Sequence, residues 1–321
     1  MSVHAAHRLL VDALRRPLVV SYGAGVDSTA MLVGMWARGI RPDLILFADT
    51  GAEQPGTYAY LFVMEAWLER VGFPPITIVR RRPPKAPYAS LEGQCQANNQ
   101  MPSLAYGGKS CSIEWKAKPQ HRYLRTWAPA VECWARGAKV QRAIGFDDSG
   151  ADQKRTARCN RVAFAIGLDD SAADRKRARK SQARYAGGGL EADKFEYLYP
   201  LQEWGWDRAQ CIEVIRAAGL PVPMKSSCYF CPAMKKPEIV ALAANAPDLF
   251  ERAVAIEAAW LASKNGPAAR AAAGKTTSTK GLGRRFAWAD CPTDPAAAAE
   301  WAKPKRRARK ATTQLPLPLA A

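Results

Sequence analysis

Short and almost entirely apolar runs alternate with amphipathic stretches along the first half of the chain. Such runs, apolar on both faces apart from their last residue, are typical of the central strands of a parallel sheet. Three of them predict strands, at Leu18–Ser21, Leu44–Ala48 and Ile76–Arg80. The amphipathic stretches between them, about Thr29–Arg38 and Thr57–Val71, predict helices. This alternation favours a parallel sheet with right-handed crossover connections.

Two later segments extend the expected sheet. Val140–Phe146 predicts a further strand, and Tyr197–Pro200 is either an edge strand or an extended segment. Between the third and fourth strands, the proline-rich stretch Arg81–Pro87 cannot continue a strand, because proline lacks the amide donor and fixes φ. We expect it to begin a long loop that reaches about Tyr106.

The pattern predicts an α/β protein with a Rossmann-like parallel sheet and helices on both faces. We expect residues 1–262 to form one domain, with a mobile basic loop at about 151–190 and a small cysteine-containing helical part at about 200–262. After Ser263 the chain is rich in Ala, Lys, Pro and Thr and has few large apolar side chains. Such a composition predicts a disordered basic tail at 263–321.

The net charge of +18 is concentrated in two stretches. Residues 154–184 hold 10 Lys/Arg against 3 Asp/Glu, and residues 263–321 hold 12 against 3. A nucleic acid or another polyanion is the functional interpretation, and improved solubility is the alternative. No apolar run approaches the roughly 20 residues that cross a bilayer, and the charged N-terminus does not suit a signal peptide, so we expect a cytoplasmic protein without membrane contact.

A glycine-bearing turn follows the first predicted strand. Gly23, Ala24 and Gly25 lead into Asp27 and Ser28, which open a helix. Backbone amides in such a turn, together with the positive end of the helix dipole, suit a phosphate, and small residues let it approach the backbone. We therefore expect a nucleotide here, although an ordinary strand-to-helix connection would have the same pattern. The predicted phosphate-binding set is Ser21, Gly23, Ala24, Gly25, Asp27 and Ser28.

Cysteines supply the second candidate chemistry. Cys228 and Cys231 form the single CxxC of the chain, and Cys111 lies far upstream. Three interpretations stay open: a metal or iron–sulfur site, a redox dithiol, and a structural coincidence. The five other cysteines sit singly and are expected to be small buried or surface residues. A fourth ligand would have to come from Cys291, Cys159 or Cys95.

The glycine turn resembles the PP-loop motif, SGGxDS, of the ATP pyrophosphatase superfamily, with Gly23 and Ala24 departing from the motif's Ser and first Gly. Four later segments resemble elements of the PAPS reductase branch of that superfamily. In chain order, these elements are the DTGxExPxTY strand end, the Cys-x4-Lys-x2-Pro stretch, the acidic turn with its arginine, and the closing helix with its Cys pair. These segments are FADTGAEQPGTYAYL, KSCSIEWKAKP, IGFDDSGADQKR, and YPLQEWGWDRAQC with SSCYFCP. The resemblance spans about residues 15–240 and implies an adenine nucleotide alpha-hydrolase-like fold.

The resemblance implies ATP and Mg²⁺ as cofactors and assigns roles to particular residues. Asp27 and Ser28 are expected at the phosphates, and Asp49, followed by Thr50 and Gly51, near the nucleotide or its Mg²⁺. Lys116 and Arg155 would offer positive charge to an anionic acceptor or to the departing pyrophosphate. The implied ligands of a [4Fe–4S] cluster, or alternatively of Zn²⁺, are Cys111, Cys228 and Cys231.

Three functions follow from these expectations. The leading one is a PP-loop enzyme that adenylates a substrate, releases pyrophosphate and then transfers sulfur from a donor protein to nucleic acid. The second is a sulfonucleotide reductase acting on PAPS or adenosine phosphosulfate. Those reductases carry Cys-Cys where this chain has Cys111-Ser112, and their nucleophilic cysteine lies in a different tail context from Cys291. The third is a binding module for nucleotides or nucleic acid whose altered turn no longer catalyses.

Overall fold

A computed structural model describes residues 15–108, 110–153, 194–292 and 294–303. The basic stretch 154–184 therefore lies outside the described residues. So do Arg155 and Cys159, two residues with candidate roles in the sequence analysis. Across the described part of the chain, no helix combines the length and the apolar character needed to cross a membrane.

Five parallel strands form one sheet in the order β3-β2-β1-β4-β5. The strands are β1 Leu18–Tyr22, β2 Leu44–Asp49, β3 Ile76–Arg80, β4 Val140–Ile144 and β5 Phe195–Leu198. In the central register, Val20 of β1 lies between Ile45 of β2 and Ala143 of β4. The predicted parallel sheet is confirmed, and the segment left open as strand or extended chain is the edge strand β5.

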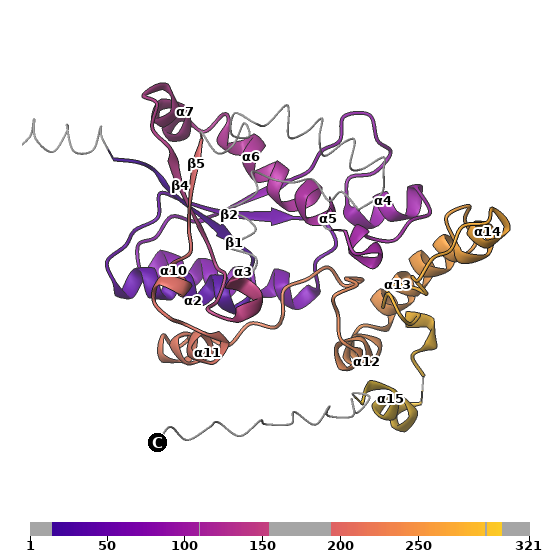
Figure 1. The fold of residues 1–321 in the computed structure, drawn as a ribbon. Coiled ribbons are helices and arrows are strands. Elements are labelled where there is room, and N and C mark those ends of the chain that lie inside the picture. Colours follow the sequence, from indigo (N-terminus) through magenta and orange to yellow (C-terminus); the bar gives the residue numbers. More distant parts are fainter. Residues whose placement is uncertain (1–14, 109, 154–193, 293, 304–321) are drawn as a thin grey trace, which may run out of the picture.

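Helices cover both faces of the sheet (Figure 1). The helices of this part of the chain are α2 Val26–Ala37, α3 Pro55–Arg70, α6 Lys118–Leu124, α7 Ala128–Ala135, α10 Pro200–Glu203 and α11 Arg208–Ala217. One apolar core joins alternate β1 residues, Val20 among them, to α2, α3 and α11. Val19 belongs to a second core on the opposite face, together with α6 and α7. Alternation of side chains along the strands thus divides the sheet between two helical layers.

The predicted helices start slightly earlier than their apolar patterns. α2 begins at Val26 because extended Gly25 caps it, and α3 begins at Pro55, where proline's missing amide costs no helical hydrogen bond. The expected loop from Arg81 to Tyr106 contains more structure than the sequence suggested. It holds the helix α4 Leu91–Ala97, which Ser90 caps by accepting a hydrogen bond from Gly93 N, and the 3₁₀ turn η1 Ser103–Tyr106.

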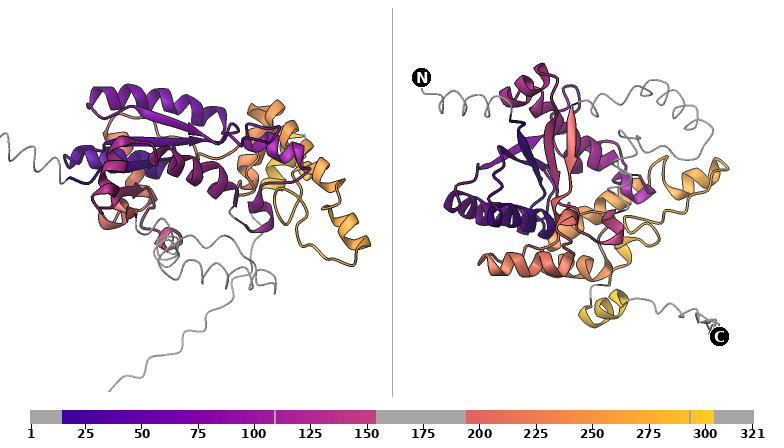
Figure 2. Two further views of the ribbon diagram at one scale, coloured as in Figure 1. Left: turned by 90° about the horizontal axis from the view of Figure 1, so that it is seen from above. Right: turned by 60° about the vertical axis from the view of Figure 1, so that its left-hand side comes forward.

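The C-terminal part forms a third apolar core beyond the edge of the sheet toward which the strands run (Figures 1 and 2). Its elements are α12 Lys236–Asn245, α13 Pro247–Leu261, α14 Pro267–Ala272, the 3₁₀ turn η3 Trp288–Asp290 and α15 Pro295–Ala302. Between the two parts lie the short helix α5 Ser110–Ser112 and the π-helical turn η2 Ile113–Ala117.

The prediction of a disordered tail from residue 263 onward is wrong for the described residues up to 303. Leu282 and Trp288, two of the few large apolar side chains in this stretch, are fully buried. The buried carboxylate of Glu257 accepts hydrogen bonds from Leu282 N, Trp288 N and Ala289 N, at 2.6, 3.0 and 3.0 Å. A carboxylate supplied by α13 thus satisfies backbone amides at Leu282 and at the start of η3 that lie outside any α-helix or strand. Residues 304–321 lie outside the described part.

Candidate active site

The turn after β1 has the geometry expected of an anion site. Ala24 has φ of 53°, in the left-handed region, and Gly25 is extended and caps α2. The Ser28 hydroxyl accepts hydrogen bonds from Gly23 N and Gly25 N, at 3.2 and 3.4 Å, and donates to Gly25 O at 3.2 Å. Ser28 therefore holds two of the predicted phosphate-binding amides in place, beside the N-terminal end of a 12-residue helix.

This turn lies where the strand order reverses. β2 and β3 extend from one side of β1, and β4 and β5 extend from the other. In open parallel sheets, ligands bind beyond the carboxyl ends of the strands at such a switch point. A Cβ atom added to Gly145, directly after β4, would come within 2.9 Å of the Ser28 backbone, so glycine is needed for the two strand ends to approach this closely.

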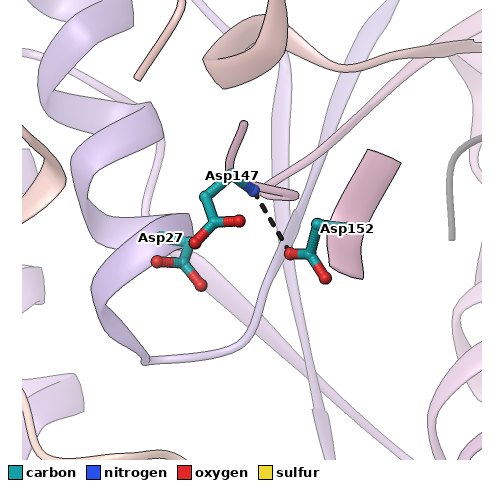
Figure 3. Close-up of side chains that lie close together, drawn as sticks. All are labelled: Asp27, Asp147 and Asp152. Atoms are coloured by element: carbon teal, nitrogen blue, oxygen red, sulfur yellow. Dashed lines mark hydrogen bonds between the residues drawn. The ribbon is translucent and has the colours of Figure 1, made fainter. Parts of the chain in front are cut away.

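Three carboxylates converge beside the turn (Figure 3). Asp27, Asp147 and Asp152 each bring an oxygen within 4.8 Å of the other two. Asp152 Oδ2 also accepts a hydrogen bond from Asp147 N at 3.2 Å, which fixes the loop after β4. An all-oxygen, all-anionic donor set suits a hard divalent cation such as Mg²⁺. Among the described residues, no other group of His, Cys, Asp or Glu is gathered this closely.

The charge balance of this acidic trio favours a bound cation. Burial raises the pKa of Asp27, and the neighbouring Asp147 and Asp152 add to the rise. Arg208 opposes it through an ion pair with Asp27 Oδ1 at 2.7 Å, but the Arg208 side chain stays 46% exposed. Three carboxylates gathered this closely repel one another, and a metal ion bound to nucleotide phosphates could be shared among them.

Asp49, which the sequence placed near the nucleotide or its Mg²⁺, lies at the end of β2 with both oxygens occupied. Arg80 donates to Oδ2 from Nε at 2.7 Å and from Nη2 at 2.6 Å. Tyr58 Oη and Gly51 N donate to Oδ1, each at 2.7 Å. Asp49 is 2% exposed and is not part of the acidic trio. Its contacts organise the loop that contains Thr50 and Gly51.

Ser21 also makes contacts other than those expected. Its hydroxyl accepts a hydrogen bond from Arg142 Nε at 2.9 Å and donates to Gln120 Oε1 at 3.1 Å. Arg142 and Gln120 are both buried and contact each other. The Ser21 side chain therefore joins β1, β4 and α6, while the amides of the turn are held by Ser28.

Lys116 lies in the π-helical turn η2 and pairs with a buried glutamate. Its Nζ is 2.8 Å from Oε1 of Glu53, whose side chain is 0% exposed. Burial alone would lower the pKa of the Lys116 ammonium, but the Glu53 carboxylate outweighs it, so that the pKa is raised and the lysine stays charged. The second oxygen, Glu53 Oε2, is buried and has no hydrogen-bond partner among the described residues. π-Helical turns are often found at functional sites.

The CxxC loop contacts this ion pair. Cys228 Sγ is 3.4 Å from Thr50 Oγ1 and 4.0 Å from Glu53 Oε1, and the backbones of Glu53 and Cys228 form an isolated antiparallel bridge. Burial raises the pKa of the Cys228 thiol, and the Glu53 carboxylate raises it further. Lys116 opposes this rise and is the group that would favour a thiolate.

The three predicted metal ligands share one region without forming a compact trio. Cys111 and Cys231 are partly buried and pack against the third apolar core, to which buried Cys228 belongs. In the described chain their three sulfurs are not all within 4.8 Å of one another. The thiol of Cys111, in α5, and those of the CxxC loop are donors that suit a soft metal or an iron–sulfur cluster. The cluster or Zn²⁺ stays a prediction.

The cysteines that sit singly follow the sequence expectation. Cys95, Cys133, Cys211 and Cys291 are all buried. Burial raises the pKa of Cys95 and of Cys211 to about 12 in each case. Cys95 and Cys291 belong to the same core as Cys228. Both candidates for a fourth ligand within the described residues thus lie in the part of the core that Cys111, Cys228 and Cys231 share, which we call the cysteine region.

Sequence reasoning missed several residues of this edge. Asp147 and Asp152 belong to a turn that the sequence marked as acidic, but their contact with Asp27 depends on the pairing of β1 with β4. Arg208 and Glu53 lie in segments that the resemblance includes, Glu53 as the Glu of DTGxE, but their partners Asp27 and Lys116 are brought to them only by tertiary packing. Ser226 is a further such residue, because its Oγ would lie 2.9 Å from a Cβ added to Gly25.

Together these features define an α/β protein of the parallel, Rossmann-like type with a candidate anion and cation site at the topological switch point. No protein-family model matches the chain, and no curated protein matches it. Among solved structures, the chain is similar to the phosphoadenylyl-sulfate (PAPS) reductase from Candida auris in its phosphate complex. The two are 17% identical, the match covers 70% of this chain and 82% of the reductase, and the TM-score is 0.37. A similarity of this degree carries no argument about what this chain binds or catalyses.

Proposed function

We propose that this chain binds Mg²⁺–ATP at the turn after β1 and transfers the adenylyl group to an acceptor with release of pyrophosphate. The observation that carries the proposal is the meeting of the acidic trio with the Ser28-braced turn at one switch point. Amide donors suit the phosphate oxygens, and the three carboxylates suit the accompanying metal ion. Cleavage between the α- and β-phosphates is taken from the resemblance of the turn to the PP-loop motif.

Each residue then has a defined task. The amides of Gly23 and Gly25, which donate to the Ser28 hydroxyl in this structure, exchange it for phosphate oxygens, and Asp27 and Asp147 would hold Mg²⁺. Arg208 exchanges part of its contact with Asp27 for the leaving pyrophosphate. An acceptor oxygen attacks the α-phosphorus, the bond from phosphorus to the bridging oxygen breaks, and pyrophosphate leaves with the bonding electrons while Arg208 stabilises its growing negative charge. A Mg²⁺ ion held by the carboxylates would add to this stabilisation. Arg155, outside the described residues, keeps its proposed role as a further cation.

Transfer of sulfur to a nucleic acid is the finer part of the proposal. It is supported by the cysteine region at the same edge of the sheet, where Lys116 and Glu53 lie beside Cys228. Cys111, Cys228 and Cys231 would hold an iron–sulfur cluster or zinc, and a cluster would supply a site for the incoming sulfur. Lys116 would keep positive charge next to that site, toward the anionic acceptor.

The reductase alternative is disfavoured by the position of Cys291. A reductase of this kind needs an accessible nucleophilic cysteine near its C-terminus. Cys291 is 7% exposed within the third core, and burial raises its pKa. Its thiol is therefore a poor nucleophile where it stands.

The products of ATP turnover test the proposal. The full chain is incubated with Mg²⁺, ATP labelled at the α-phosphate and a nucleic-acid acceptor, and the products are separated by chromatography. We expect pyrophosphate, with the label in AMP or on the acceptor. Formation of ADP and inorganic phosphate would overturn the assignment. Release of sulfite from a sulfonucleotide in the presence of thioredoxin would favour the reductase instead.

A further inference from the structure

A polar cavity of about 500 Å³ lies in the C-terminal part, away from the acidic trio. Its walls come from the η1 turn, the end of α13, Arg270 on α14 and the segment Thr276–Thr279. The volume falls in the range of roughly 300–1,000 Å³ that is typical of ligand sites. None of the proposed ATP-binding or metal-binding residues lines it.

The cavity walls are held together by hydrogen bonds between distant segments. Thr279 Oγ1 donates to Ala105 O at 3.3 Å, which fastens the segment to the η1 turn. Lys275 N donates to Arg270 O at 2.8 Å, and Arg270 Nη2 donates to Thr276 O at 3.4 Å. Residues 275–279, expected to be disordered, therefore form a fixed wall.

The chemistry of the lining favours an anion. Among the described residues, the cavity is lined by one guanidinium, several hydroxyls and two side-chain amides, and by no carboxylate. Two lining residues also carry buried N–H groups, Arg270 Nε and Trp260 Nε1, which have no hydrogen-bond partner among the described residues. Because these two N–H groups are shielded from solvent, the preference for an anion comes from the charge of Arg270 and from the hydroxyls of the lining.

The charge around the cavity extends this preference. Residues 263–285 contain six Lys or Arg and no Asp or Glu. Lys264, Lys275, Lys280 and Arg284 are all exposed. A surface of this kind attracts a polyanion over a longer range than one guanidinium can.

An aromatic ring at the cavity narrows the class of polyanion. Tyr106 is 48% exposed, and its ring lies 6.0 Å from that of buried Trp260 at an angle of 60°. An exposed ring supported from behind is a stacking platform for an unpaired base, whereas the bases of a duplex are stacked on one another and are not available to it.

A second cavity adjoins the first on the side of Cys95 and Cys111. Gln100 and Tyr106 line this second cavity of about 170 Å³, whose wall includes Cys95 and Cys111. A strand seated on Tyr106 thus lies next to a cavity that reaches one of the predicted metal ligands.

We propose that this cavity binds a single nucleic-acid strand, with a phosphate at Arg270 and the Thr276–Ser278 hydroxyls and an unpaired base on Tyr106. The strand is the anionic acceptor of the proposed function, and this assignment of its role rests on that function. Binding itself requires no ATP, so it can be measured separately.

Fluorescence anisotropy of the full chain, without ATP, tests the site. The probes are a labelled 12-nucleotide DNA strand, the RNA strand of the same sequence and the corresponding DNA duplex, over a salt series. We expect Arg270→Gln to weaken strand binding about 10-fold and to reduce the salt slope by about 0.7, the value for one phosphate contact on a single strand. The matched control Arg125→Gln removes an exposed arginine outside the cavity and is expected to change affinity less than about twofold.

The stacking contact has its own variants. Tyr106→Leu should weaken strand binding at least about fivefold, the lower end of the range for a stacked base, and leave duplex binding unchanged. Tyr106→Phe keeps the ring and should bind nearly as the parent does. A preference for the DNA or the RNA strand identifies the source of the ligand, and either supports the site.

A measurement on the unmodified chain guards against variants that misfold. Strands carrying 5-iodouracil are photo-crosslinked, and mass spectrometry locates the attached peptide, which is expected to contain Tyr106. The proposal is overturned if the crosslinks fall only outside residues 100–111 and 260–285, or if Arg270→Gln and Arg125→Gln have equal effects. Neither result would bear on ATP cleavage, and a failure of ATP cleavage would leave strand binding measurable.

Discussion

Acidic side chains at the carboxyl edge of the sheet form two groups that differ in how they are paired. Beyond β1 and β4, Asp27, Asp147 and Asp152 stand together against the half-exposed Arg208. Beyond β2, Asp49 and Glu53 each have a cation of their own, from Arg80 and Lys116 respectively. The first group gathers three carboxylates around a point where a cation brought with the ligand could be shared, whereas each carboxylate of the second group has an ion pair of its own. Whether carboxylates at a strand end suit a metal therefore depends on how they are gathered and paired, and burial alone does not decide it.

The strongest test of this comparison is the removal of one carboxylate from the acidic trio. Asp147→Asn keeps an oxygen for its hydrogen bond from Ser149 N but removes the charge. We expect pyrophosphate formation to fall about 10²- to 10³-fold, as for other groups that stabilise transition-state charge, because Mg²⁺ is held less well. Stabilisation by Mg²⁺ and ATP, measured as a shift in Tm, should also be lost.

Asp148→Asn is the matched control, one residue further along the same loop. Asp148 contacts Gln153 and lies outside the trio, so both readouts should stay near those of the parent. If instead Asp49→Asn abolished the Mg²⁺ effect while Asp147→Asn preserved it, the metal would belong to the end of β2.

The second test leaves the β2 carboxylate without its cation. Lys116→Met should lower the free energy of unfolding by about 2–3 kcal/mol, because the charge of Glu53 then has no partner in an apolar setting. This value is set below the cost for a fully buried pair, since the Lys116 side chain is 37% exposed. Chemical denaturation measures it.

Lys118→Met provides the comparison on the same segment. Lys118 pairs with Glu114 at the surface, with side chains 61% and 33% exposed, and its loss should cost less than about 0.5 kcal/mol. Lys116→Met combined with Glu53→Gln should recover part of the loss, because the unpaired charge is gone. Equal costs for the two lysines would show that the Glu53 pair is no more than a surface ion pair.

The third test pushes the two strand ends of the switch point apart. A methyl group at Gly145 would meet the backbone of Asp27 and Ser28 at 2.9–3.1 Å, and backbone yields less readily than a side chain. We expect Gly145→Ala to cost about 1–2 kcal/mol of stability and to weaken ATP binding measured by calorimetry. Gly150→Ala, where nothing lies within 4 Å, should affect neither. An unchanged ATP affinity in Gly145→Ala would separate this contact from nucleotide binding.

The sheet and the phosphate turn could be predicted because their signals are local. Ile76–Arg80 has the same ends in the sequence pattern and in the structure, and the glycines at 23 and 25 mark the turn directly. The acidic trio needs β1 and β4 side by side, which no local pattern encodes. The ordered C-terminal part depends on the buried carboxylate of Glu257. The backbone amides that donate to it are 25 to 32 residues further along the chain. Composition identified its positive charge but not its fold.

The smallest effect concerns the one departure from the PP-loop pattern that the backbone explains. Ala24 stands where the motif has glycine, and its φ of 53° is a conformation that L-residues other than Gly adopt at a cost of about 1 kcal/mol. Ala24→Gly relieves this strain but makes the unfolded chain more flexible, so we expect a net stabilisation of less than about 1 kcal/mol. Ala37→Gly, at the end of α2 in ordinary helical conformation, lacks the strain and should destabilise by up to about 1 kcal/mol. Calorimetric affinity for ATP should be unchanged in both variants, because the turn supplies backbone amides in either case. A loss of affinity in Ala24→Gly alone would mean that the methyl group holds the turn in its binding shape. The turn after β1 would then be fixed by side-chain contacts, as the loop after β2 is.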